Sequence, residues 1–375
     1  MSLHSVKLAN AYRSWDFLTR KSLPSGPFII VVDDLANLDR SQFNRHSEID
    51  DILETFESIL KSPNDLSELE LLKVKNSVAF LKSKDLKPNR ELVSQCGGEF
   101  KKIDLNEISV LSSKIKELGR GLPGKYIEQI DSSKNYAYKI IESAYSFLRA
   151  HLGNLPALEF TFTKPAASNP FGAQVITDFS GKLILELPEN QSFDPMFPNM
   201  ILHEVLGHVM HFSQLKSNSS LQAKPHLLCI SNHTHESFFI EAIAQLISGF
   251  LIFNQNWNFT GKDLMMHSEL IYHRNQAIAH YNMTEIIDGK RSSAEAAQIH
   301  LDLCEQTGNI ERLSQKYESI TNDLFSVKVA LNYTCAFAAV ESLLRKSHSE
   351  FFKIFSQLIN EYHTPETLKN FVLST

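Results

Sequence analysis

MILHEVLGHVMHFSQL, residues 200–215, is the most informative stretch of this 375-residue chain. Its apolar residues recur every three to four positions, a period that predicts a helix with one buried face. The helix carries His203, Glu204 and His208 in the pattern HExxxH. A second apolar helix follows within His233–Phe250, and short alternating segments precede the first. We therefore predict a mainly α fold with a small sheet beside a helix that binds a metal ion.

The HExxxH spacing demands a distorted helix if both histidines bind one ion. Histidines at i and i+4, as in the zinc-protease pattern HExxH, lie about 40° apart on a helix. His203 and His208 are at i and i+5, which an ideal helix separates by about 140°. A one-residue π-bulge would bring them together. Gly207 lies inside the interval, where it would relax the backbone.

Two other interpretations of these histidines remain open. Glu204 and His208 are spaced i and i+4, with His211 one turn further on, so these three could bind an ion without any distortion. That arrangement removes Glu204 from the role of general base. Alternatively, His203 and His208 are buried core residues with ordinary polar partners.

A site with two histidines also needs a third ligand from a separate element. Glu241 lies in an otherwise apolar stretch, where an unpaired carboxylate would be costly. Glu236 lies nearer the predicted start of the same helix, where the helix dipole favours an acidic residue. We therefore prefer Glu241 as the third ligand.

Composition narrows the functional classes. The chain has 37 Lys and Arg against 43 Asp and Glu, a net charge of −6, which argues against nucleic-acid binding. Six of its 15 His lie between His203 and His235, which favours a metal site. The N-terminus shows no secretory signal, and the longest apolar runs are too short to span a membrane. The four widely spaced cysteines indicate free thiols, so we expect a cytoplasmic protein without membrane contact.

One segment with strong helix-breaking residues interrupts the rest of the chain. GRGLPG, residues 119–124, separates an N-terminal helical region (residues 1–120) from a predicted catalytic domain (residues 121–375). Strands are expected at Leu158–Thr163, Ala173–Thr177 and Lys182–Leu187, the last two joined as a hairpin by an FSG turn. The remaining periodicity is helical, at 47–118, 125–152, 264–283, 293–306, 310–347 and 349–361.

The order of hairpin, HE…GH helix and E-A-x-A helix (Glu241–Ala244) resembles the gluzincin metallopeptidases. Within that group it resembles the proteins called domain of unknown function 885, and beyond them the thermostable carboxypeptidases and thimet oligopeptidases. RSSAEAAQIHLDLCEQTG (residues 291–308) and NYTCAFAAVESLLR (residues 332–345) are similar to two further helices of the first group. The HExxxH spacing equals that of tubulin-type tyrosine carboxypeptidases.

This resemblance implies a helical ellipsoid divided by a central channel with zinc at its floor. Carried over residue by residue, His203, His208 and Glu241 would be the ligands and Glu204 the general base. Tyr333 matches a family tyrosine that would donate a hydrogen bond to the oxyanion. The Asp and His that the family carries before its S-x-E-x-A helix are replaced here by Met283–Ile287.

The leading hypothesis is a zinc-dependent hydrolase of a peptide or small amide, similar to a carboxypeptidase or dipeptidase. Arg274 or Arg345 would anchor a substrate carboxylate, and the strand at Lys182–Leu187 would pair with an extended substrate. An alternative is a biosynthetic enzyme acting on a small molecule, with Fe²⁺ or Mn²⁺ in place of Zn²⁺, since two histidines and one carboxylate also hold non-haem iron. A further alternative is a non-catalytic scaffold of the same fold. The sequence leaves the oligomeric state open.

Overall fold

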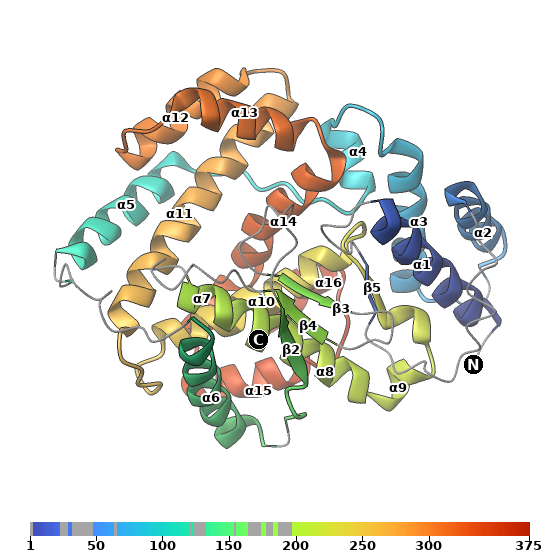
Figure 1. The fold of residues 1–375 in the computed structure, drawn as a ribbon, viewed down its shortest axis with the longest axis horizontal. Coiled ribbons are helices and arrows are strands. Elements are labelled where there is room, and N and C mark those ends of the chain that lie inside the picture. Colours follow the sequence, from blue (N-terminus) through green and yellow to red (C-terminus); the bar gives the residue numbers. More distant parts are fainter. Residues whose placement is uncertain are drawn as a thin grey trace.

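The computed structural model describes residues 3–22, 29–31, 48–63, 66–120, 122, 133–153, 155–163, 174–177, 183–186 and 197–375. Over these residues the protein is mainly α-helical, as predicted, with two small sheets. Figure 1 shows the three-stranded sheet in the middle of the molecule, with helices from both halves of the chain around it. The mainly α fold class is therefore confirmed.

The N-terminal region is helical, as its periodicity predicts. Its helices are α1 (Leu3–Ser22), α2 (Ile49–Lys61), α3 (Glu68–Ser83), α4 (Arg90–Gln95), α5 (Leu105–Gly119) and α6 (Ser133–Leu152). Helix α3 begins at a capping box, in which Ser67 and Glu70 satisfy each other's backbone N–H groups. Helix α1 was not predicted. Residues 125–132, the start of the helix predicted over 125–152, lie outside the described residues.

The predicted hairpin is present: β3 (Gln174–Thr177) pairs antiparallel with β4 (Leu183–Glu186). Its FSG turn lies outside the described residues. Strand β2 (Phe160–Thr163) pairs parallel with the other edge of β4, so the order is β2-β4-β3. The prediction that the strand at 182–187 receives an extended substrate is therefore wrong, because both hydrogen-bonding edges of β4 are already paired.

A second sheet was missed entirely. Strand β5 (Cys229–Ser231) lies in the part of the chain predicted to be helical, and it pairs antiparallel with β1 (Ile29–Val31). Three residues are too few to show a period of two, and the partner strand is 200 positions earlier in the chain.

The HExxxH helix is built of three consecutive segments: α7 (Phe197–Ile201), the π-helix η3 (Leu202–Val209) and α8 (Met210–Ser217). The short helices α9 (Ser219–Gln222) and η4 (Pro225–Leu227) lead from it to β5. Helix α10 (Glu236–Phe253) packs extensively along η3, and β3 and β4 contact η3 from the sheet. The predicted position of the small sheet beside this helix is confirmed.

The C-terminal part is helical throughout. It comprises α11 (Lys262–Ile287), α12 (Ser293–Cys304), α13 (Ile310–Thr321), α14 (Leu324–Val340), η5 (Glu341–Arg345), α15 (His348–Leu358) and α16 (Pro365–Ser374). The single helix predicted over 310–347 is wrong, because the chain breaks at Asn322. Asp323 then caps α14 by accepting a hydrogen bond from the Ser326 N–H. Helix α16 was not predicted, although Thr364 and Pro365 are a typical helix start.

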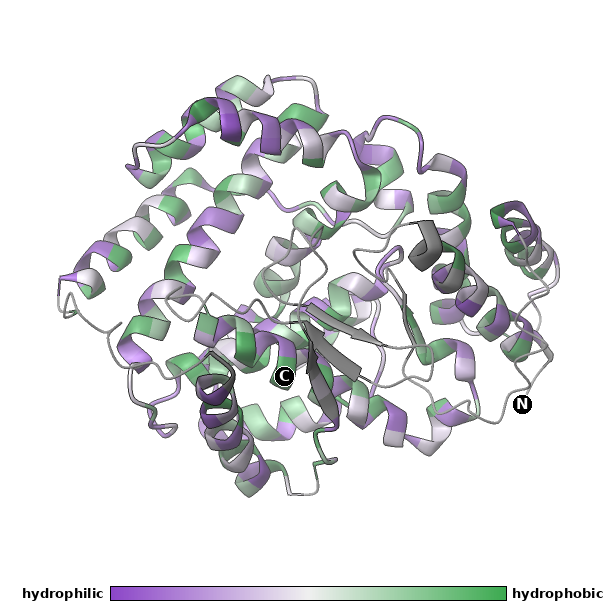
Figure 2. Cartoon of the chain, viewed as in Figure 1, coloured by the Kyte–Doolittle hydropathy of each residue, from purple (hydrophilic) through white to green (hydrophobic). Residues whose placement is uncertain are grey.

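Two large apolar cores hold the molecule together. One surrounds η3 and α10 and includes residues of α6, α14, α15 and α16. The other joins α1, α2 and α3 to α11, α13 and α14, so it crosses the predicted domain boundary at residue 120. The outer helices, such as α5 and α12, alternate hydrophilic and hydrophobic residues along the ribbon (Figure 2).

Among the described residues, two helical stretches, Glu236–Phe253 and Leu324–Arg345, are long and apolar enough to cross a membrane, which the run lengths in the sequence did not indicate. The first stretch is 94% buried inside the protein. Burial in the protein core accounts for its apolar character without a membrane.

Candidate metal centre

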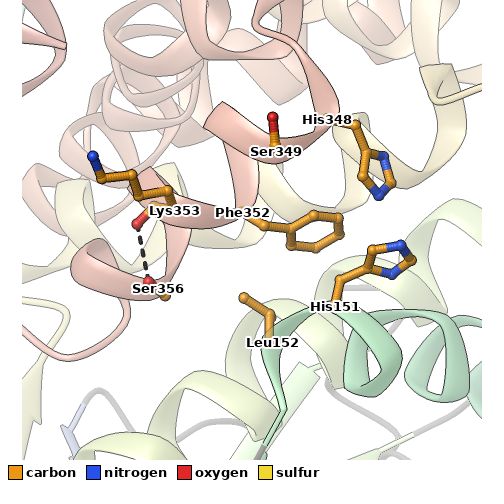
Figure 3. Close-up of a pocket in the computed structure, with 7 residues that line it drawn as sticks. All are labelled: His151, Leu152, His348, Ser349, Phe352, Lys353 and Ser356. Carbon is orange, nitrogen blue, oxygen red and sulfur yellow. Dashed lines mark hydrogen bonds between the residues drawn. The ribbon is translucent and has the colours of Figure 1, made fainter.

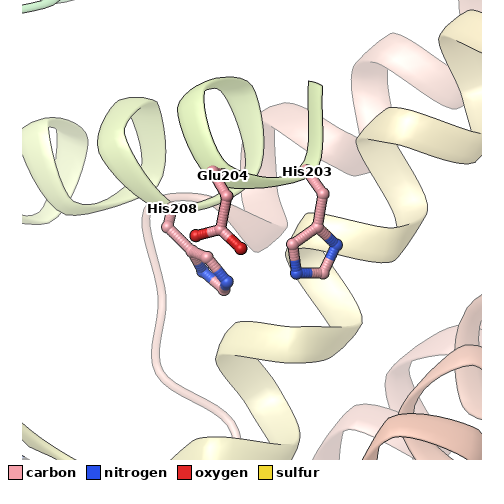
Figure 4. A group of neighbouring side chains, drawn as sticks. All are labelled: His203, Glu204 and His208. Atoms are coloured by element: carbon pink, nitrogen blue, oxygen red, sulfur yellow. The ribbon is translucent and has the colours of Figure 1, made fainter. Parts of the chain in front are cut away.

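The helix around the HExxxH pattern is distorted in the way that its spacing predicts. Residues Leu202–Val209 form a π-helix, and the N–H of Met210 donates to the carbonyl of Val205, five residues earlier. In a π-helix, residues five apart lie nearly one above the other. The ring centroids of His203 and His208 are consequently 4.9 Å apart. Both side chains project, with Glu204, from the same side of the helix (Figure 4).

Gly207 has a different role from the one predicted. Its backbone has no positive φ, so conformational freedom does not require glycine there. Instead, a Cβ on Gly207 would lie 2.4 Å from Cβ and 2.5 Å from Cα of Ala244 in α10. Glycine therefore permits the close approach of η3 and α10, and this approach brings the histidines to the third predicted ligand.

Glu241 of α10 lies against both histidines. Its Oε2 is 3.2 Å from His203 Nε2, and its Oε1 is 3.7 Å from His208 Nε2. A tetrahedral ion with metal–ligand bonds of about 2.0–2.1 Å places neighbouring ligand atoms about 3.3 Å apart. Ligand atoms of His203, Glu204 and His208 also lie within 4.8 Å of one another. The three predicted ligands and the predicted base are thus brought together.

The donor atoms themselves fit a metal ion. Within the described part of the chain, His203 Nε2 and Glu241 Oε2 are buried but make no hydrogen bond, although they face each other at ion-pair distance. Buried polar atoms without partners are rare in folded proteins and call for an explanation. Two imidazoles and a carboxylate that converge in this way are a donor set that could hold a mononuclear zinc ion once His203 loses its proton.

The two histidines differ in their affinity for protons. Burial opposes the protonation of His203, but the neighbouring carboxylates of Glu241, Glu204 and Glu269 outweigh burial and raise its pKa to about 9. Burial, together with the positive charge of His203, holds the pKa of His208 well below its usual range. The metal-free centre therefore carries one proton on His203 at neutral pH, and His208 is neutral.

Two tyrosines lie beside these carboxylates. The ring of Tyr333, on α14, is nearly parallel to that of His203 at 6.1 Å. Burial and the adjacent Glu241 and Glu204 raise the pKa of Tyr333 well above its ordinary value. Tyr272, on α11, has a pKa raised by burial and by Glu241, Glu269 and Glu204. The phenols of both residues stay protonated at neutral pH and can donate hydrogen bonds.

Sequence reasoning missed Tyr272 and a polar group behind it. Glu269 is buried, accepts a hydrogen bond from Asn199 Nδ2 at 2.8 Å, and lies 3.2 Å from His273 Nε2. Asn199 precedes His203 by four residues, so this group supports the start of the HExxxH helix. The sequence does contain a pattern that points to this group, because polar residues recur every three or four positions in α11, at 269, 272, 273 and 276.

The remaining clustered histidines have other surroundings. His211, the alternative ligand, is fully buried against Phe212 and Phe239. His226 lies 2.8 Å from Glu70, His233 packs against Trp15 and Phe80, and His235 hydrogen-bonds Asn76. The alternative carboxylate, Glu236, forms a buried ion pair with Lys73 at 2.8 Å.

The two predicted substrate anchors are not brought into the centre. Arg274 is buried but donates to the side chain of Asn275 and lies beside Cys304. The side chain of Arg345 is 81% exposed and pairs with Glu341 at 3.5 Å. Arginines are compatible with so many surface and structural positions that residue type alone could not place them.

A separate pocket of about 430 Å³ lies between α6 and α15, lined by His151, His348 and Phe352 among others (Figure 3). The two imidazoles approach with centroids 4.4 Å apart. Asn254 uses its Oδ1 to accept the N–H of Asn256, so its Nδ2 donates to His348 Nδ1. Neutral His348 then carries its proton on Nε2, which leaves no lone pair there for a metal ion.

No protein-family model and no curated protein sequence matches this chain. Among solved structures, the fold is similar to that of a chain described as a "putative lipoprotein" from Colwellia psychrerythraea, with 12% sequence identity and a TM-score of 0.54. The match covers 86% of this chain and 66% of the other, which is less than two thirds of that protein. At this identity, the likeness shows a shared fold alone.

Proposed function

We propose that this protein is a zinc-dependent hydrolase of a peptide or amide bond. The observation that carries the proposal is the position of Glu241, whose two carboxylate oxygens lie 3.2 Å and 3.7 Å from Nε2 of His203 and of His208. The convergence of two histidines from the π-helix η3 and one carboxylate from α10 is explained if the three residues bind one ion. The resemblance to the gluzincin peptidases supports the same reaction class.

Zn²⁺ bound by His203, His208 and Glu241 would supply a Lewis acid and lower the pKa of its water to about 7. Glu204 would accept the proton of the attacking water and return it to the leaving amine. Tyr333 would donate a hydrogen bond to the developing oxyanion, an interaction worth about 3 kcal/mol when well aligned. Its raised pKa supports this role, because the phenol keeps its proton at working pH.

The substrate proposed is a peptide or small amide, as for a carboxypeptidase or dipeptidase. Neither Arg274 nor Arg345 supports recognition of a substrate carboxylate, since their partners lie elsewhere. An extended substrate would have to pair with β2 or β3, because β4 is the central strand. Of these two strands, β3 makes more contact with η3.

A second candidate keeps the metal centre and changes the reaction. Two histidines and one carboxylate also suit Fe²⁺ and, with oxygen-rich surroundings, Mn²⁺. The carboxylates of Glu204 and Glu269 near His203 provide such oxygen-rich surroundings and favour this second candidate. Metal analysis of protein purified without added metal, with and without oxygen, would separate a biosynthetic iron enzyme from a zinc hydrolase. A non-catalytic scaffold would bind no stoichiometric metal at all.

A cytoplasmic location without nucleic-acid or membrane partners remains part of the proposal. The net charge of −6 supports the absence of nucleic acid. The similar fold belongs to a protein described as a "putative lipoprotein", so the competing location is the cell envelope. Fractionation of cells that express the chain at its native level would distinguish the two.

The test of the reaction is Glu204→Gln, which removes the base and keeps the side-chain volume. Against a panel of dipeptides, N-acyl peptides and amino-acid amides, turnover should fall by about 10²–10⁴-fold. Metal content should stay at the wild-type level. Glu107→Gln, at an exposed position in α5, is the control and should leave turnover unchanged. Full activity of Glu204→Gln would contradict the proposed mechanism.

A further inference from the structure

One side of α10 carries polar residues at intervals of four: Ser237, Glu241 and Gln245. Residues four apart lie on the same side of a helix, so these three form one stripe. All are more than nine-tenths buried in a helix whose other residues are mostly apolar. Buried polar groups are costly unless each is hydrogen-bonded, and helix α14 supplies partners along the stripe.

The first residue of the stripe is held from two positions on α14. Ser237 Oγ accepts hydrogen bonds from Lys328 Nζ and Asn332 Nδ2, both at 2.8 Å. Asn332 is fully buried, and its Oδ1 accepts the N–H of Glu99 at 2.9 Å. Lys328 Nζ also donates to the carbonyl of Thr234 at 2.9 Å. The start of α10 is thereby fixed to α14.

The last residue of the stripe is held by the neighbour of Asn332. Gln245 Nε2 donates to the backbone carbonyl of Tyr333 at 2.9 Å. Glu241 lies between Ser237 and Gln245, and the phenol of Tyr333 lies beside its carboxylate. Helix α14 therefore forms hydrogen bonds with α10 one turn before Glu241 and one turn after it.

We propose that Gln245 and Asn332 are positioning residues, which fix the register of α10 on α14 and so hold Glu241 against Tyr333. Apolar packing between two apolar helices is non-directional and tolerates sliding. A slide by one residue would shift Glu241 by about 1.5 Å and rotate it by about 100°. Directional hydrogen bonds on both sides of Glu241 exclude such a slide. The inference rests on the proposed function, because it assumes that Glu241 and Tyr333 act together.

The test compares Gln245→Met and Asn332→Leu with the control Asn282→Leu. Asn282 is also fully buried and donates to the carbonyl of Ala296 at 3.0 Å and to Tyr317 Oη at 3.2 Å, away from the centre. Four properties are measured, of which the first three are the Tm of metal-free protein, the Zn²⁺ affinity by chelator competition, and the visible absorption of Co²⁺-loaded protein. Hydrogen exchange of α14 amides in metal-free protein is the fourth.

All three variants should lower Tm. Gln245→Met and Asn332→Leu should also weaken Zn²⁺ binding about 10–100-fold, the range found when outer partners of metal ligands are removed. They should alter the Co²⁺ spectrum and speed exchange in α14. Asn282→Leu should leave affinity, spectrum and α14 exchange as in the wild type.

Wild-type affinity, spectrum and α14 exchange in Gln245→Met would overturn the inference even if Tm fell. Equal losses of affinity in Asn282→Leu would also overturn it, since general destabilisation would then be the cause. If the wild type bound no metal, the proposed function would fail. Hydrogen exchange would still decide whether Gln245 and Asn332 fix α14.

Discussion

Gly207 of the π-helix and Ala244 of α10 lie in direct contact, with only 2.4 Å between the Ala244 Cβ and the point where a Cβ on Gly207 would stand. This contact sets the distance between the two helices that carry the proposed ligands. His203 and His208 belong to the helix of Gly207, and Glu241 lies one turn before Ala244. The packing of one glycine thus controls the distance between the proposed ligands.

Gly207→Ala should push η3 away from α10. Overpacking of a buried contact costs about 1–3 kcal/mol. The same displacement should separate Glu241 from the histidines and weaken Zn²⁺ binding. Thermal unfolding and chelator competition measure the two effects.

Gly249→Ala is the matched control, because Gly249 lies in α10 and a Cβ there would meet only the Leu344 side chain at 3.4 Å. Alanine at this position should be neutral or stabilise by up to about 1 kcal/mol, as alanine does within helices. Equal stability and Zn²⁺ affinity in the two variants would show that the contact between Gly207 and Ala244 does not determine the geometry of the proposed centre.

Zn²⁺ affinity should depend on pH through His203. The pKa of His203 in the metal-free protein is raised to about 9, so metal binding must release its proton below that pH. The affinity should therefore rise roughly tenfold per pH unit from pH 7 towards pH 9 and level off above it. Chelator competition at fixed ionic strength measures this slope, and a flat profile would contradict the assignment of the proton to His203.

The stability of the metal-free protein should follow the opposite trend. Because the folded pKa of His203 is raised, its protonated pair with Glu241 stabilises the fold fully below the ordinary pKa of about 6.5. That contribution is lost as the pH rises through about 9. The difference in Tm between wild type and His203→Asn should shrink over this interval, while Tyr333→Phe should retain the wild-type trend.

Glu70 should contribute to stability in the acid range. Burial disfavours its carboxylate, but His226, Ser67 and Lys224 outweigh burial and hold its pKa well below 4.5. A depressed pKa stabilises the fold above the ordinary value, and the contribution is lost as the pH falls below it. Glu70→Gln should destabilise by about 1.5–3 kcal/mol at neutral pH, as expected when hydrogen bonds to a charged group are weakened.

The difference in the free energy of unfolding between wild type and Glu70→Gln should decrease progressively below pH 4.5. Urea titrations repeated at each pH measure it. Glu57→Gln, which removes the partly exposed partner of Lys82, should change the midpoint far less than Glu70→Gln at every pH. A difference that stays constant into strong acid would refute the role of the ionised carboxylate.

The sequence predicted a local distortion such as a one-residue π-bulge, on the premise that His203 and His208 bind one ion and must face the same way; the structure has a π-helix of eight residues there. The sequence misjudged Gly207, because the reason for glycine lies in Ala244, which no local pattern relates to it. The strand pair β1–β5 was missed for a similar reason: three-residue strands carry no period, and their pairing spans 200 positions.

The candidate centre was likewise predictable only in part. Glu241 stood out as a carboxylate in an apolar helix, whereas Tyr272 and Glu269 lie in α11, where polar residues are so frequent that their recurrence is hard to pick out. Asp323 has the residue type of a helix N-cap, but the helical periodicity continues on both sides of it, so the sequence predicted one helix instead of two. Arg274 and Arg345 carried no periodic or local signal, so their partners became known only from the fold.

The metal stoichiometry of wild type, His203→Ala and His211→Ala, measured by elemental analysis after saturation with Zn²⁺ and removal of excess metal, tests the central claim most directly. Binding by His203, His208 and Glu241 predicts one equivalent in wild type and in His211→Ala, and none in His203→Ala. Retention of the ion by His203→Ala with its loss from His211→Ala would instead assign the site to Glu204, His208 and His211. No bound metal in wild type would contradict the metal centre altogether.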